Sequence, residues 1–298
     1  APISGAVRAA FDAETGLTSL AGTLDISAGA LSPVEGSAPQ AFDAARAYFL
    51  YDPERQRLNF SEISVASDTL ALTGSGHTDL ADVQRGWPTA FVGQFRVDEV
   101  RLADDALFSE PVTVNDLTAD MRLRLDPFTV DFGQITAPND GEIVRARAHI
   151  EARSDGWSYG IDAETDAITT ETVLAFWPLN EARGTRRWLT ENVQSGHLRE
   201  VAVALRKGAA TKLTYALNFD IEDAQVRFLP AMPPVTNGFG RATLAEDRFT
   251  LVLNQGVLAV PGGGEIDGSG SVLTIPNVDT KPAVGVFDIK AQGAIGDM

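Results

Sequence analysis

The chain has 298 residues, of which 44% are hydrophobic and 22% are charged, a balance typical of a folded protein with a core of its own. Its net charge is -17, from 41 acidic and 24 basic residues, and this excludes nucleic acid as a partner, because phosphate binding depends on clustered Lys and Arg. With no cysteine there is no disulfide, thiolate catalysis or cysteine-ligated metal, and no run is apolar enough for a membrane-spanning helix.

Apolar and polar residues alternate with period two along most of the chain, which predicts strands. The alternation is clearest over residues 213–223, and turn formers separate the segments at Asp52-Pro53, 139–141, 154–156, Asn237-Gly238 and 262–264. In chain order, the apolar positions of the main segments are Leu58 and Phe60; Leu70 and Leu72; Met121, Leu123 and Leu125; Val144 to Ile150; Trp157, Tyr159 and Ile161; Val201, Val203 and Leu205; Leu213, Tyr215, Leu217, Phe219 and Ile221; and Phe249, Leu251 and Leu253.

Strands that recur at roughly ten-residue spacing predict a mainly β chain, an antiparallel meander of a dozen strands or more. The alternation leaves two arrangements open. Two sheets that close on each other would make a sandwich with a core about 10 Å thick. One long sheet that curls without closing would present the same apolar residues along an open trough.

Two segments of the chain resemble each other weakly. The segment that starts at Phe42 and the segment that starts at Phe239 both run from an aromatic residue through an acidic-arginine turn to a second and a third strand, and both end in Gly-Ser-Gly. Such a repeat is typical of sheets that grow by adding hairpins.

One stretch, FWPLNEARGTRRWLTENVQSG from Phe176, interrupts the strand pattern with a helical one. Thr170 is expected to cap a first helix that Pro178 ends at or before Trp177. A second helix is expected to start at Thr185 and to stop at Gly196. Four residues of these helices, Phe176, Trp177, Trp188 and Leu189, should then lie against a sheet.

The sequence gives little support to catalysis. The three histidines, His77, His149 and His197, have no metal-binding spacing, and there is no nucleophile elbow, P-loop or dinucleotide fingerprint. Acidic pairs such as Glu222-Asp223 fall mostly at strand ends, so a glycosidase with paired carboxylates is the least favoured class. The glycine run at 262–264 is similar to a calcium-binding repeat, but Glu265 stands where that pattern needs glycine. We therefore expect no enzyme, no metal and no cofactor.

The helical stretch resembles a signature of the AsmA-like superfamily, in its YhdP-like branch. The signature is a phrase FWP, then basic residues, RxW, Asn and Gly, followed by a strand. Its positions here are Phe176, Trp177, Pro178, Arg183, Arg186, Trp188, Asn192 and Gly196, with the strand at Val201 to Leu205. The flanking strand pairs, from Phe42 and from Gly238, are similar in character to those of the family. About twenty residues carry the specific part of the likeness.

The resemblance implies a long, strongly curved antiparallel sheet, a half-pipe or β-taco whose apolar inner wall conducts phospholipids from the inner towards the outer membrane. It implies a periplasmic protein of the cell envelope, without catalytic residues. Because the chain starts and stops within strand-like sequence, we expect 1–298 to be one elongated segment of a longer protein, with its inner-membrane anchor and flanking segments outside it. Its parts would be strands over 1–168, a helical insertion over 169–196 and strands over 197–298.

From the alternation, we expect the groove to be lined by Leu58, Phe60, Leu70, Leu72, Met121, Leu123, Leu125, Val201, Val203, Leu205, Leu213, Tyr215, Leu217, Phe219, Ile221, Phe249, Leu251 and Leu253. The insertion would cover one section of it through Phe176, Trp177, Pro178, Trp188 and Leu189, although completing an ordinary core is the other role open to these residues. The rival to a phospholipid-binding groove is a structural or protein-binding β-sandwich module with a closed core.

Overall fold

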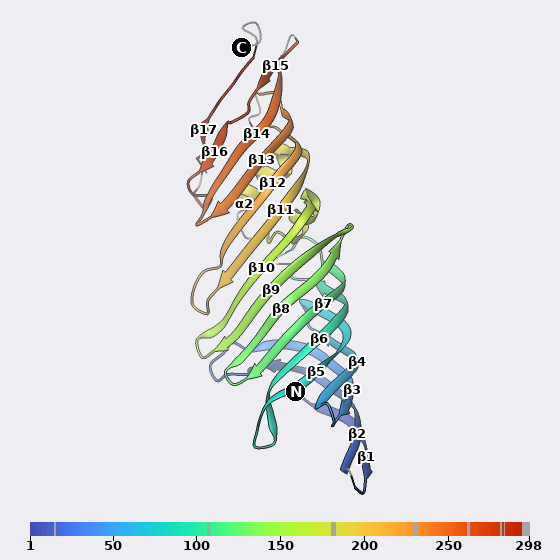
Figure 1. Cartoon of the computed structure of the whole chain (residues 1–298). Helices are drawn as coiled ribbons and strands as arrows, with labels where there is room; N and C mark the ends of the chain where they lie inside the picture. The colour runs from blue at the N-terminus through green and yellow to red at the C-terminus, as the bar shows by residue number, and fades with distance from the viewer. Residues whose placement is uncertain are drawn as a thin grey trace.

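A computed structural model describes residues 1–14, 16–105, 108–179, 183–228, 232–260, 263–280, 282 and 284–293. The protein forms one antiparallel sheet of 17 strands with two short helices (Figure 1). The sheet is long and curved, and the helices interrupt it near residues 170–195. The predicted mainly β fold with one helical insertion is therefore confirmed.

The elements follow one another along the chain. They are β1 (Ile3–Asp12), β2 (Gly16–Leu31), β3 (Gln40–Asp52), β4 (Arg57–Ala66), β5 (Leu70–Gln84), β6 (Trp87–Leu102), β7 (Val112–Leu125), β8 (Phe128–Asn139), β9 (Glu142–Arg153), β10 (Gly156–Thr169), α1 (Thr170–Phe176), α2 (Arg183–Asn192), β11 (Val193–Lys207), β12 (Thr214–Val226), β13 (Val235–Ala245), β14 (Arg248–Val260), β15 (Gly264–Asp267), β16 (Val272–Ile275) and β17 (Val286–Asp288).

Each strand from β1 to β14 pairs with the next one in the chain, as a meander requires. At the C-terminal end, β15 and β16 both pair with β14, each along a different part of the same strand, and β17 then pairs with β16. The two similar segments found in the sequence correspond to β3–β5 and β13–β15. In the second of them, the third strand is shortened to four residues.

The sheet curls strongly towards one face. Trp157, at the start of β10, donates a hydrogen bond from its indole Nε1 to the carbonyl of Ala38 in the β2–β3 connection, at 2.7 Å. Seven strand spacings separate β3 from β10, about 34 Å measured along the sheet. Direct contact over that separation requires the sheet to bend back on itself. The face that carries Trp157 is therefore the concave face.

No second layer of described residues packs on this sheet over its whole length. The surface accessible to solvent is 17843 Å², whereas a compact monomer of 31.7 kDa would expose roughly 12,000 Å². No large side chain among the described residues is completely buried. A closed sandwich of this size would bury many, so the sandwich arrangement is not the one adopted.

The helices begin earlier than the sequence suggested. The first cap is Thr169, whose Oγ1 accepts a hydrogen bond from the Thr172 amide at 3.2 Å, so the prediction of Thr170 was wrong by one residue. This helix ends before Trp177, as expected from Pro178. The second helix starts at Arg183 and ends at Asn192.

Two glycine positions predicted as a stop or a turn lie inside strands. Gly196 belongs to β11, with φ of 140°, and a Cβ there would lie 3.0 Å from the Cα of Ala224. Asn237-Gly238 lies in β13, where the register shifts and Asn237 has φ of 49°. Both glycines therefore serve sites of register shift, because a bulge needs the same unusual backbone conformations as a turn.

The convex face of the sheet is polar and carries ion pairs between neighbouring strands. Arg46 pairs with Asp25, Arg57 with Asp79 at 2.6 Å, and Arg241 with Asp220 at 2.6 Å. In each pair the two residues stand directly opposite each other in the register. Such cross-strand pairs stabilise a sheet modestly and favour one register over its alternatives.

The Arg57–Asp79 pair gives a test by pH. The hydrogen bond from Arg57 lowers the pKa of Asp79 below its ordinary value of 3.8. The folded state therefore gains stability above this ordinary value and loses it as the pH falls through the lowered pKa. We expect Asp79→Asn to lower the thermal unfolding midpoint slightly at neutral pH and to match the parent protein at low pH. Asp68→Asn, which makes the same charge change at an exposed turn, is the control. A difference that persists in acid would show that the pair is not its cause.

Candidate functional site

The candidate site is the concave face of the sheet. One set of directly opposed residues crosses this face from β1 to β14 and on to β16, and each of its members is apolar or glycine. We call it the apolar row: Val7, Gly22, Phe49, Phe60, Gly76, Phe95, Ala119, Ile135, Ala146, Ala163, Val203, Leu217, Leu244, Phe249 and Ile275. At the usual strand spacing the row is about 65 Å long.

The residues predicted to line a groove share this face, with one exception. A second row of opposed residues joins Leu58 on β4 to Met121 on β7, through Thr78 and Gly93, and continues through Phe132, Ala148 and Ile161 to Leu205 and Tyr215. The other predicted positions follow from the two rows by alternation within their strands. Leu213 precedes β12, so no strand register fixes its face.

The N-terminal part of the face has a smooth aromatic floor. The ring of Phe60 lies 6.4 Å from that of Phe49 and 6.2 Å from that of Phe95, measured between centroids. Gly22 and Gly76 stand beside these rings in the row, and a Cβ at either would lie within 2.8 Å of Phe49 or Phe95 ring atoms. The glycines therefore let the rings lie along the sheet instead of projecting from it. The period-two pattern of apolar residues did not identify Gly22 and Gly76 as lining positions, because glycine has no apolar side chain to count.

The C-terminal part of the face is packed into a core. Val201, Phe219 and Leu251 are between 6% and 8% exposed and cluster with Ala242 and Leu273. Leu217, Phe249 and other predicted lining residues pack against this cluster. The expectation that Phe219 is open to a guest molecule was therefore wrong, because its own neighbours cover it.

Helix α2 covers one side of this core. Trp188 packs on Phe228 with ring centroids 5.9 Å apart, and Phe228 contacts both the core and Phe287. Figure 1 shows the helical segment behind β11 to β13. Arg186 ties the two helices together through a hydrogen bond to the carbonyl of Leu174 at 3.3 Å.

The other residues of the insertion differ in their exposure. Leu189, Trp177 and Pro178 are half-buried. Phe176 remains 42% exposed, unlike the prediction that it lies against the sheet, because it stands at the last position of a short helix. The stacking of Trp188 on Phe228 is thus the contact that joins the insertion to the core.

The two ends of the strands form the two rims of the trough. One contact joins these rims across the N-terminal part of the trough. In a meander, successive connections alternate between the two ends of the strands, so the β2–β3 and β9–β10 connections lie on opposite rims. Trp157 joins them through its hydrogen bond to Ala38 and also packs edge-on against Phe128, with centroids 5.9 Å apart. A Cβ at Gly36, which has φ of 87°, would lie 2.7 Å from the carbonyl oxygen of Ser154. We call this contact the rim clasp.

Two features of the polar side chains in the described part bear on metal binding and on acid–base chemistry. No group of three or more His, Asp or Glu side chains there could hold a metal ion. The pKa of Asp79 is lowered by Arg57 and that of Asp267 by Ser269, whereas a general acid needs a raised pKa. In the glycine run at 262–264, Gly262 lies outside the described residues. His149 Nδ1 forms a hydrogen bond with Asp131 Oδ1 on the convex face, at 2.6 Å.

Comparisons with models of known protein families, with curated proteins and with solved structures gave no match. None of the helices in the described residues has the length and apolar character needed to cross a membrane.

The buried core gives a test of stability. Phe219→Ala should lower the free energy of unfolding by about 3–5 kcal/mol, because it empties a filled position. Leu125→Ala on the same face should cost much less, since Leu125 is 46% exposed. Denaturant unfolding of both variants measures this contrast, and equal losses would contradict the division of the face into a packed and an open part.

The rim clasp gives a test of closure. Trp157→Phe removes the indole N–H but keeps a ring against Phe128, so the two rims should separate more often. Because the chain has no cysteine, Glu35→Cys and Asp155→Cys allow spin labels to be placed on the two rims alone. We expect a short, narrow distance distribution that broadens to longer distances with Trp157→Phe. An unchanged distribution would show that the hydrogen bond does not hold the rims together.

Proposed function

We propose that this chain is a segment of a periplasmic AsmA-like protein whose concave face binds the acyl chains of phospholipids and conducts them between the inner and the outer membrane. The observation that carries the proposal is the apolar row, which runs from β1 to β14 and on to β16 across a sheet that no second layer of described residues covers over its whole length. The resemblance in the helical insertion supports the family and the periplasmic location, with the membrane anchor and flanking segments outside this chain.

The energetics favour this use of the face. Each methylene group kept from water is worth about 0.8 kcal/mol, so a chain of sixteen carbons would face roughly 12 kcal/mol if it crossed water bare. A leaflet of a bilayer is about 15 Å of hydrocarbon, so a row of about 65 Å is several acyl chains long. An apolar wall of this length lowers the barrier without a specific pocket, and polar head groups can remain in water at the rims.

The packed C-terminal core limits where lipid can lie. The open part runs over β1 to β10, where the larger predicted lining residues, from Leu58 to Leu125, are half-buried or exposed and where the aromatic floor lies. The rim clasp crosses this part of the trough, so an acyl chain beneath it would slide lengthwise. The cluster around Phe219 and the helix α2 would form a closed section at the other end until it is displaced.

Lipid loading tests the proposal. Delipidated protein should take up a fluorescent phospholipid, and Leu123→Asp should reduce the uptake several-fold, because it places a charge on the open face. Leu125→Asp, at the more exposed rim, is a second variant that should retain its fold. Thr113→Asp is the control, since Thr113 lies on the same strand and is exposed on the convex side.

The fold of each variant is checked by circular dichroism. Failure of the parent protein to take up lipid, or equal loss in Thr113→Asp and Leu123→Asp, would contradict a lipid-binding concave face.

A further inference from the structure

The sheet has two open edges, and they lie towards opposite ends of the molecule. Among the described strands, β1 pairs with β2 alone and β17 pairs with β16 alone. Figure 1 shows β1 at one end of the elongated sheet and β17 near the other. Every residue of these two strands is exposed. An open edge offers unpaired backbone groups to a further strand, and most proteins protect such edges.

Hydrogen bonds along β1 show which of its backbone groups face outward. The carbonyl of Pro2 accepts a hydrogen bond from the Ser27 amide at 3.0 Å, and the carbonyl of Ala10 accepts one from the Thr18 hydroxyl at 3.1 Å. Both carbonyls therefore face β2. Because backbone groups alternate in direction along an antiparallel strand, the odd-numbered residues from 3 to 9 direct their amides and carbonyls to the open edge.

The same reasoning applies to β17 and the residues that follow it. The amide of Lys290 donates to the Ser271 hydroxyl at 3.0 Å, and the carbonyl of Lys290 accepts from that hydroxyl at 3.1 Å. Gln292 exchanges two backbone hydrogen bonds with Asp267. The even-numbered residues of this stretch thus face the sheet, and residues 287 and 289 direct their backbone groups outward.

The two edges also present side chains on known faces of the sheet. Val7 belongs to the apolar row, so its neighbour Arg8 lies on the convex face. Phe287 stands opposite Leu273 of the packed core, which puts Phe287 on the concave face and its neighbour Asp288 on the convex face. Within the described residues, neither Arg8 nor Asp288 forms an ion pair or hydrogen bond through its side chain. The two edges can therefore offer opposite charges to each other.

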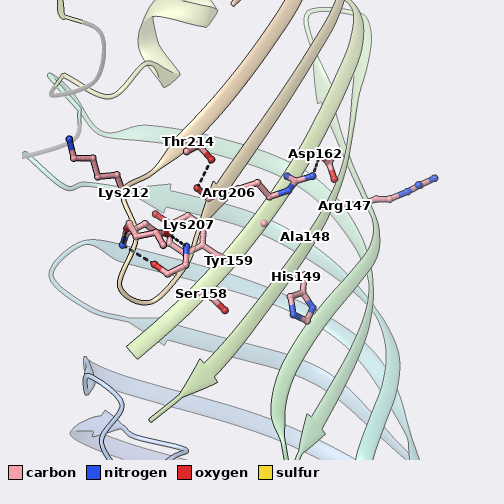
Figure 2. A pocket seen from close by; sticks show the side chains of 13 residues that line it. Arg147, Ala148, His149, Ser158, Tyr159, Asp162, Arg206, Lys207, Lys212 and Thr214 are labelled. Atoms are coloured by element: carbon pink, nitrogen blue, oxygen red, sulfur yellow. Dashed lines mark hydrogen bonds and ion pairs between the residues drawn. The ribbon is translucent and has the colours of Figure 1, made fainter. Parts of the chain in front are cut away.

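Arginine and carboxylate side chains already join neighbouring strands inside the sheet. Arg241 on β13 pairs with Asp220 on β12 at 2.6 Å. Figure 2 shows another such pair, in which Arg206 on β11 donates to Asp162 on β10 at 2.6 Å. A contact between Arg8 of one copy and Asp288 of a second copy would be of the same kind.

We propose that copies of this chain associate head to tail, with the edge of β17 in one copy adding as an antiparallel strand to the edge of β1 in the next. The register that sets Arg8 opposite Asp288 also sets Val7 opposite Ile289, and residue 9 opposite residue 287. All four residues of these last two pairs direct their backbone groups outward, as a hydrogen-bonded pair requires. Charge and backbone hydrogen bonding therefore select the same register.

The apolar side chains agree with this register. Val7 is 65% exposed and Ile289 is 66% exposed, and both lie on the concave side, where each would cover part of the other. The concave faces of the two copies then lie on one side of a continuous sheet. Because two different edges meet, the contact is heterologous and can continue into an open chain of copies.

A symmetric pairing of two β1 edges fits less well. A register that uses the whole strand is centred on Val7 and places Arg8 opposite Ala6 of the other copy, so it supplies no acid. The head-to-tail contact involves the edges of the sheet and not the lining of the trough. It therefore does not rest on the binding of lipid.

Sedimentation velocity over a range of protein concentrations tests the proposal. The contact is short for a stable interface, so we expect reversible association at high concentration that extends beyond dimers. Arg8→Asp and Asp288→Arg should each raise the concentration needed for association about tenfold, because each places like charges directly opposite each other. The control is Arg101→Asp, which makes the same charge change as Arg8→Asp at an exposed position of the interior strand β6 and should associate like the parent.

Two further samples make the test specific. A mixture of the Arg8→Asp and Asp288→Arg variants should associate again, because each variant carries the edge that the other needs. Val7→Pro removes an outward-facing amide without a change of charge, and proline is tolerated at such an edge position. This variant should remain monomeric while circular dichroism shows an intact sheet.

The proposal is overturned if the parent protein stays monomeric at every concentration, or if the mixture of the two charge variants does not associate. It is also overturned if association stops at a dimer that Asp288→Arg does not affect, which would indicate pairing of two β1 edges. Loss of lipid uptake in Leu123→Asp with unchanged association would keep this proposal separate from the lipid proposal.

Discussion

The structure depends on one constraint: a single layer of sheet has to be stable without a second layer to cover it. Each strand therefore gains most of its stabilisation from the two strands beside it. On the convex face this comes from opposed arginine and carboxylate pairs such as Arg57 and Asp79. On the concave face it comes from apolar neighbours in the register, where Phe60 contacts rings on β3 and β6. The division into a polar and an apolar face follows from strand alternation alone.

The two parts of the concave face cover their apolar side chains in different ways. The C-terminal part uses its own side chains, with Phe228 and Trp188 closing over the cluster around Phe219. The N-terminal part leaves its rings partly uncovered and brings its rims together through Trp157. An uncovered apolar surface of this extent is unusual in a soluble monomer and is typical of a surface that meets an apolar partner.

The sequence predicted the features that depend on local pattern. Alternation placed Met121, Leu205 and Tyr215 on strands, and the register puts them on one face. Pro178 correctly ended the first helix. The errors lie where distant residues decide the outcome. Phe219 is buried because residues from other strands and Phe228 surround it, and Asn237-Gly238 forms a bulge where the same residues in isolation favour a turn. Trp157 bonds a residue 119 positions away, which no local pattern reveals.

The rim clasp also bears on how the protein unfolds. In a meander whose strands touch only their neighbours, the ends can fray independently, as in a linear array of repeats. The bond between Trp157 and Ala38 links β10 to the β2–β3 connection, so the strands between them cannot separate from each other at that end without breaking it. The strands after β10 are outside that loop. Partial melting from the C-terminal side could therefore open the packed section while the clasped section keeps its shape.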